Sequence, residues 1–146
     1  MRLLPGTGRL ARVRLLLAVL VVFLLSGCQP PQATWDDIPP TPGAQPYAGP
    51  DTARLDERID ARIRERDAVI LGDRVERLPA GTSWADHLAW RDAHVRPLGR
   101  SRELVPEPDA PVLYAEWSRA ARTLLVVGVV GADGRLVVRT TLLGPR

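Results

Sequence analysis

The residue types that could support catalysis are few, and three of them lie in one short stretch. Ser83, Asp86 and His87 are a serine, an acid and a histidine, the residue types of a nucleophile triad. Ser83, however, stands where a helix needs an N-terminal cap, and the G-x-S-x-G sequence of a nucleophile elbow is absent. We therefore expect Ser83 and Asp86 to cap a helix, and the sequence predicts that the protein is not an enzyme.

Metal and phosphate sites are not indicated either. His87 and His94 are the only histidines, and seven residues of helix separate them by roughly 10 Å, too far to share one metal ion. Gly128, Gly131 and Gly134 resemble a phosphate loop only in number, because the pattern around them is strand-turn-strand instead of strand-to-helix. We expect no metal and no cofactor.

The chain begins with a stretch typical of exported proteins. Residues 1–14 contain four arginines and no acid, and the run 15–25 is entirely apolar. A basic start, an apolar core of about 7–15 residues and small residues after it are typical of a signal peptide. Because a spanning helix needs roughly 20 apolar residues, this run is too short to be one. The alternatives are an uncleaved buried helix or an ordinary signal peptide.

Cys28, the only cysteine, gives this stretch its chemistry. Leu25-Ser26-Gly27-Cys28 resembles the lipobox of bacterial lipoproteins. The resemblance implies cleavage after a signal peptide at 1–27, a diacylglyceryl group on the Cys28 thiol and an acyl chain such as palmitate on the new amino group. Gln29 replaces the aspartate of inner-membrane retention, which implies the periplasmic face of the outer membrane, or the cell membrane in a host with one membrane.

Removal of the signal peptide changes the charge of the protein. All 20 basic residues are arginine and four lie in the signal peptide, which leaves 20 − 4 = 16, while all 17 acids follow Cys28. The mature side-chain charge is therefore 16 − 17 = −1, and we expect no nucleic-acid binding. With Cys28 acylated no thiol remains, so disulfides and thiolate metal sites are excluded for the monomer.

The segment 28–50 is rich in proline and is predicted to be a disordered linker between the lipid and the domain. Proline fixes φ and removes a backbone donor, so the segment cannot join a helix or a central strand. Extended, it would reach roughly 70 Å. Trp35, Ile38 and Tyr47 are exceptions, and they either pack back on the domain or form a docking motif. Its prolines are Pro30, Pro31, Pro39, Pro40, Pro42, Pro46 and Pro50.

A single domain is predicted over 51–146, and it begins with a helix after Asp51 as N-cap. Apolar residues at four-residue spacing, Leu55, Ile59 and Ile63, form one narrow seam. Beside this seam lies a row of arginines that we expect to be solvated; the alternative is a ridge facing anionic lipid heads or an acidic partner. The row consists of Arg54, Arg58, Arg62 and Arg66.

The remainder predicts one more helix and several strands. The stretch 68–78 is either two short strands across a Gly72-Asp73 turn or a continuation of the first helix. A second helix follows Ser83, and 99–111 is predicted to be a surface loop. The last third predicts a three-stranded meander over 112–117, 124–130 and 136–142, ending at an edge strand. The fold class is α+β, with two helices packed on a small antiparallel sheet.

The sequence supports a binding role more than a chemical one. Trp90 beside Arg91 is the best candidate for an interface anchor, because Trp and Arg are enriched at binding hot spots. We expect a structural or adaptor component of the cell envelope that binds another envelope protein. Alternatives are an accessory lipoprotein of a secretion or conjugation apparatus, or a periplasmic module with a small-ligand cleft. The order helix, helix, three strands is similar in outline to small lipoproteins of the outer-membrane assembly machinery.

Overall fold

The computed structural model describes residues 32–95, 98, 101–103 and 112–146. The chain divides into two compact units, Met1–Pro31 and Gln32–Arg146, and the fold below is that of the second. The predicted signal peptide and Cys28 lie outside the described residues. No helix in the part of the chain that the structure covers is long and apolar enough to cross a membrane.

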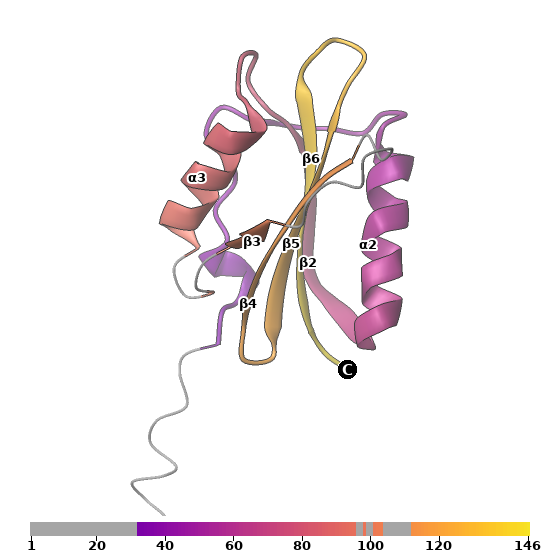
Figure 1. Ribbon diagram of the computed structural model, residues 1–146, viewed down its shortest axis with the longest axis vertical. Helices are drawn as coiled ribbons and strands as arrows, with labels where there is room; N and C mark the ends of the chain where they lie inside the picture. The colour runs from indigo at the N-terminus through magenta and orange to yellow at the C-terminus, as the bar shows by residue number, and fades with distance from the viewer. Residues whose placement is uncertain (1–31, 96–97, 99–100, 104–111) are drawn as a thin grey trace, which may run out of the picture. The chain divides into compact units, whose positions relative to one another are not determined.

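The domain is an antiparallel sheet with one α-helix on each face (Figure 1). The predicted α+β class is therefore confirmed. The strand order is β1-β2-β6-β5-β4-β3, where β1 and β3 are short edge strands. The elements are η1 (Trp35–Asp37), β1 (Gln45–Pro46), α2 (Thr52–Arg66), β2 (Ala68–Arg77), α3 (Trp84–His94), β3 (Ser101–Glu103), β4 (Val112–Arg119), β5 (Arg122–Val130) and β6 (Leu136–Pro145).

The predicted meander is present, but its last strand is not an edge. β4, β5 and β6 pair in turn, and Gly134 adopts a positive φ of 75° in the turn between β5 and β6, as its position predicted. β6 also pairs along its length with β2, which places it inside the sheet. In the predicted surface loop, 101–103 instead form β3, which pairs with β4.

Both alternatives for 68–78 are wrong, because this stretch is one ten-residue strand, β2. The register shifts between Ile70 and Gly72, so Leu71 is the extra residue of a β-bulge. Gly72 belongs to no turn, and the Trp35 indole lies where a side chain at that position would be. A strand therefore separates the two helices, which differs from the order helix, helix, three strands expected from the sequence.

The α2 face of the sheet is closed mainly by aliphatic side chains. Leu55 and Ile59 are fully buried against β5 and β6, and Ile63 packs at the margin, as the seam predicted. Asp51 precedes the helix as expected, but its carboxylate makes no capping bond and instead accepts from the Tyr47 hydroxyl at 3.0 Å. Packing, more than capping, holds this helix.

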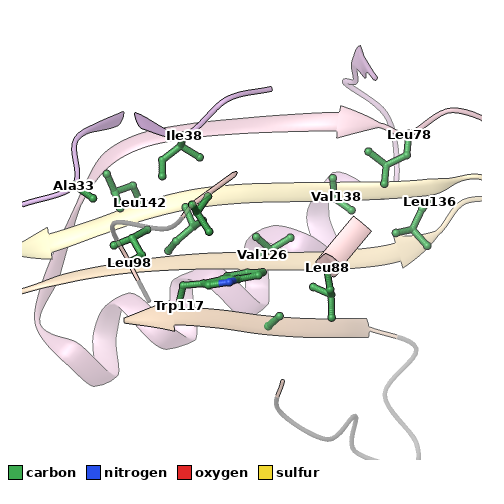
Figure 2. Close-up of a cluster of buried hydrophobic side chains, with 13 residues drawn as sticks. Ala33, Ile38, Leu78, Leu88, Leu98, Trp117, Val126, Leu136, Val138 and Leu142 are labelled. Carbon is green, nitrogen blue, oxygen red and sulfur yellow. The ribbon is translucent and has the colours of Figure 1, made fainter. Parts of the chain in front are cut away.

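The opposite face is closed by α3 together with residues of the proline-rich segment (Figure 2). Ala33 and Ile38 are each only 3% exposed, and β1 pairs with Glu76 and Arg77 of β2. The prediction of a disordered linker over 28–50 is thus wrong for residues 32–50, and the alternative that Trp35, Ile38 and Tyr47 pack back on the domain is confirmed.

Proline-rich backbone can pack here because side chains from the sheet and from α3 satisfy its polar groups. Arg91 donates to the Pro39 carbonyl at 2.7 Å, and Arg74 donates to the Ile38 carbonyl. Pro46 lies in an edge strand, where a missing N–H is tolerated. The segment forms no long regular element, yet its Ile38 and Pro39 carbonyls have hydrogen-bond partners.

Candidate functional site

A row of four aromatic side chains lies along α3. Trp84, His87, Trp90 and His94 follow one another at three- and four-residue spacing, so consecutive rings are neighbours on the helix surface. The ring centroids are 6.0 Å, 6.3 Å and 4.6 Å apart in that order. Trp84 is half-buried, and from His87 onward the row becomes more exposed: His87 is buried, Trp90 is half-buried and His94 is exposed.

The start of α3 is fixed by the cap that the sequence predicted. The Ser83 hydroxyl accepts from the Asp86 amide at 3.1 Å and donates to the Asp86 carboxylate at 2.5 Å. The Ser83 amide also donates to the Asp86 carboxylate at 3.3 Å, and this bond together with that from the Asp86 amide forms a capping box. The neighbouring His87 ring has no hydrogen-bond partner among the described residues, so Ser83, Asp86 and His87 are not connected as a triad.

His87 is a buried base without a partner. Only 1% of it is exposed, and both ring nitrogens lack a hydrogen bond within the described part of the chain. Burial, and then the positive charge of Arg91, lower the pKa of His87 to about 3. The imidazole is therefore neutral at physiological pH, and its ring packs between Trp84 and Trp90.

Two neighbouring side chains contact the Trp90 ring. The His94 ring is stacked on it at 4.6 Å, and the Arg91 guanidinium lies 4.8 Å from the centre of its ring, within the range of a cation–π contact. The His94 ring is itself fixed by a 2.7 Å hydrogen bond between its Nδ1 and the Trp90 carbonyl. A half-buried indole supported in this way presents a rigid apolar surface at the helix exterior.

The expectation that Arg91 lies at the surface beside Trp90 is wrong, because its side chain is fully buried. Its guanidinium donates to the Thr41 and Thr140 hydroxyls at 3.2 Å and 3.1 Å and pairs with Glu76 at 3.4 Å. Burial lowers the pKa of Arg91 to about 10, partly offset by Glu76, so the group stays charged at neutral pH. Arg91 therefore contacts the Trp90 ring although its own side chain is buried.

The arginine row on α2 differs from the expected solvated face. Arg54 is exposed, but Arg58 and Arg62 lie over the Tyr114 ring at 5.7 Å and 5.9 Å. Arg62 and Arg66 both pair with the buried Glu116 of β4, at 3.0 Å and 2.8 Å. Half of the row is thus used to hold the helix on the sheet.

The chemistry around Glu116 is that of a structural ion cluster. Burial alone would raise the pKa of Glu116, but hydrogen bonds and charge from Arg62 and Arg66 outweigh it, so its pKa lies below the usual value. Burial raises the pKa of the neighbouring Tyr114 to about 12. The cluster therefore holds an ionised acid and a neutral phenol, with both arginines already paired.

Two surface depressions could be considered as ligand sites. The larger, about 310 Å³, is lined by the end of α2, the turn between β4 and β5 and the end of β6. The smaller, about 240 Å³, is lined by Arg54, Glu57, Arg58, Ala61 and Val112. Both open to solvent, so neither would bury most of a small molecule as a small-molecule site usually does.

In the part of the sheet that the structure describes, three large apolar side chains are exposed, and two of them are adjacent. Ile70 and Leu71, adjacent at the β2 bulge, are 45% and 40% exposed, and Val130 at the far end of β5 is 57% exposed. Sequence reasoning missed the first two, because 68–71 was expected to be a short strand or the end of a helix, and neither predicts the bulge. It also missed Glu76, Thr41 and Thr140, which are far apart in sequence and reveal their pairing only in the fold.

In comparisons with known proteins, no protein-family model, no curated protein and no solved structure matches the chain. Among the described residues, no three His, Cys, Asp or Glu side chains lie together as a metal site. The fold and the site therefore define a small α+β domain with a rigid aromatic surface on one helix.

Proposed function

We propose that the protein is a lipid-anchored envelope lipoprotein that acts as an adaptor by binding another envelope protein. Support for the anchor comes from the sequence, where Leu25-Ser26-Gly27-Cys28 resembles a lipobox and Gln29 favours the periplasmic face of the outer membrane. Support for the adaptor role comes from the geometry of α3. An accessory lipoprotein of a secretion or conjugation apparatus would be one form of this adaptor.

The observation that carries the adaptor role is the rigid, half-buried Trp90. Binding hot spots are enriched in Trp, and a side chain already fixed in its bound position loses little entropy on association. The His94 ring and the Arg91 guanidinium contact the indole, at 4.6 Å and 4.8 Å from the centre of its ring. The two open depressions favour a protein partner over a small ligand, because neither encloses a volume in which a ligand would be buried.

The anchor is tested by Cys28→Ala with metabolic palmitate labelling. Wild-type protein should incorporate label and remain in the membrane fraction, because two or more acyl chains give stable attachment. The variant should accumulate as an unlabelled, uncut or soluble precursor. Equal labelling of the variant and the wild type would exclude lipidation at Cys28.

The adaptor role is tested by affinity purification in mild detergent, followed by quantitative mass spectrometry. Wild-type protein should capture an envelope protein in stoichiometric amount, and Trp90→Ala should lose roughly thirty-fold or more of it, the effect of a hot spot worth about 2 kcal/mol. Val130→Ala is the matched control, because it truncates an exposed apolar side chain on another element.

Two results would contradict the proposal. If the wild-type protein is recovered alone from intact envelopes, it is not an adaptor. If a partner is captured equally by the wild type and by Trp90→Ala, with the variant folded, the partner binds elsewhere and the α3 surface is not the docking site.

A further inference from the structure

The exposed apolar pair Ile70 and Leu71 lies at the end of the sheet where the described chain begins. The β2 bulge turns consecutive residues outward, which a regular strand would not do, since its side chains alternate between faces. Ile70 is in register with Leu143 near the end of β6, and Leu71 lies against Gly144. Two adjacent large apolar side chains are thus presented at one end of the domain.

The same end carries several arginines. Figure 1 shows that the end of α2, the turn between β4 and β5 and the end of β6 meet there, and the 310 Å³ depression joins these three elements. The Arg122 guanidinium crosses Gly144 beside Leu71. Arg64 and Arg66 lie in the last turn of α2, Arg119 and Arg122 flank the turn between β4 and β5, and Arg146 follows β6. Of these, Arg66 pairs with Glu116 and Arg146 with Asp67.

The chain also enters the fold at this end. Ala33 packs in the same buried cluster as Leu142 (Figure 2), and Trp35 covers Gly72, the residue after Leu71. Only three residues, 29–31, separate Cys28 from Gln32. Because an extended chain advances at most about 3.3–3.6 Å per residue, a lipid on Cys28 would lie within roughly 14 Å of Gln32.

We propose that this end of the sheet, through Ile70 and Leu71, inserts into the headgroup layer of the membrane that holds the lipid anchor. The inference rests on the proposed lipidation of Cys28. The short spacer identifies the occupant, because it keeps the apolar pair next to the bilayer before any protein arrives. Apolar side chains enter the boundary of the acyl chains, and an exposed arginine such as Arg64 extends its charged end to the lipid phosphates.

The opposite end of the sheet provides an internal control. Val130 pairs with Leu136, whereas Gly72 pairs with Leu142, so six residues of β6 separate the two ends. At about 3.4 Å per residue this places Val130 roughly 20 Å farther along the sheet. Val130 is more exposed than Leu71. If membrane contact is nevertheless found at position 71 and not at 130, the cause is the position in the sheet and not the exposure of the side chain.

The test places one dye at each end of the full-length lipidated protein. Because Cys28 is the only native cysteine and is acylated, Leu71→Cys and Val130→Cys each supply a unique thiol for an environment-sensitive fluorophore. The labelled proteins are reconstituted into phosphatidylethanolamine–phosphatidylglycerol vesicles with or without lipids that carry a quencher. The dye at 71 should show blue-shifted emission and quenching by the lipids, and the dye at 130 should show neither.

Controls separate this inference from the proposed function. Palmitate labelling is measured on each variant first, so a loss of acylation would count against the anchor and not against the insertion. A twelve-residue Gly-Ser insertion after Pro31 should keep acylation but reduce quenching at 71, because it lowers the local concentration of the end near the bilayer. Ile70→Cys replaces Leu71→Cys if that variant does not fold.

Two outcomes would overturn the proposal. If acylated protein shows the same solvent-exposed emission at 71 and 130, this end does not enter the membrane. If the dye at 71 is shielded in native envelope vesicles but not in pure lipid, the apolar pair binds a protein instead of the bilayer.

Discussion

The two faces of the sheet are closed by different means. On one face α2 contributes aliphatic residues such as Leu55 and Ile59, and its ion pairs lie toward the margin, at Glu116. On the other face, α3 and the segment from Ala33 to Ala44 surround a fully buried arginine, Arg91. The first face is held by apolar burial, and the second also depends on a buried polar network.

The difference shows how an irregular, proline-rich chain can become part of a core. A helix satisfies its own backbone, so α2 needs only an apolar stripe. The segment before β1 has few such bonds, and its buried carbonyls at Ile38 and Pro39 are satisfied by Arg74 and Arg91. The buried arginine therefore replaces secondary structure as the means of satisfying backbone groups on this face.

The largest expected difference between the faces is in the response to loss of an arginine. Arg91→Ala should lower the free energy of unfolding by about 3–5 kcal/mol, because the buried carboxylate of Glu76, which is 6% exposed, loses its ion-pair partner and keeps only hydrogen bonds from Thr41. Arg62→Ala on α2 should cost only about 1 kcal/mol, since Glu116 keeps Arg66 as a partner. Urea unfolding of both variants measures this, and equal losses would refute the distinction.

The next prediction concerns the proline-rich segment itself. Ile38→Ala should destabilise the protein by about 3 kcal/mol, as for a buried aliphatic residue, and Ile59→Ala on the other face should cost a similar amount. The same unfolding experiment applies. If Ile38→Ala costs less than about 0.5 kcal/mol, as at a surface site, the segment is a linker after all.

Acid should destabilise the α3 face through His87. In the unfolded chain His87 takes up a proton near pH 6.5, but in the fold its pKa is lowered to about 3 by burial and by Arg91. The unfolded state therefore binds the extra proton between these values, so stability falls as the pH decreases through that window, by up to about 1.4 kcal/mol per unit. At pH 4.5 this contribution should reach about 2–3 kcal/mol.

His87→Phe should remove this part of the pH dependence, because it keeps a flat ring and eliminates the proton site. Exposed His94→Gln is the matched control and should leave the slope unchanged. The measurement is the free energy of unfolding of the wild type and both variants between pH 7 and 4.5, from which the three pH slopes are compared. A His87→Phe variant with the full wild-type slope would show that His87 is protonated or accessible in the folded state.

The smallest expected effect is at the helix starts. Ser83→Ala should cost about 1 kcal/mol, because the Ser83 side chain accepts from the Asp86 amide in a capping box. Asp51→Ala should cost less, since that carboxylate makes no capping bond to α2. Thermal unfolding of the two variants makes the comparison, and a larger loss for Asp51→Ala would contradict it.

Local patterns predicted much of the fold. The apolar seam of Leu55, Ile59 and Ile63 predicted helix α2. The Ser83–Asp86 spacing predicted the start of α3, and the glycine turn before Leu136 predicted the β5–β6 hairpin. Each depends on residues close in sequence. The packing of 32–50 could not be predicted in this way, because its bonds join residues up to 52 positions apart.

The candidate site was predicted only in part. Trp90 is half-buried at the helix exterior, as an interface anchor must be, but Arg91 is buried. A sequence pattern for this burial did exist: Arg91 follows Leu88 by three residues and precedes Val95 by four, which places it in the apolar stripe of α3. The Gly72-Asp73 pair was misleading, because Gly72 is needed for contact with Trp35, a partner distant in sequence.

The packing of residues 33–47 is the central claim, since the support for Trp90, the short spacer after Cys28 and the buried arginine all depend on it. Amide hydrogen exchange of the full-length protein, followed by peptide mass spectrometry, tests it most directly. The Ile38, Ala44 and Tyr47 amides donate to Trp35, Thr41 and Val75 carbonyls at 3.0–3.1 Å, so peptides covering them should be protected. Full exchange of 33–47 at the rate of an unstructured chain, with α2 and β5 protected, would contradict the account.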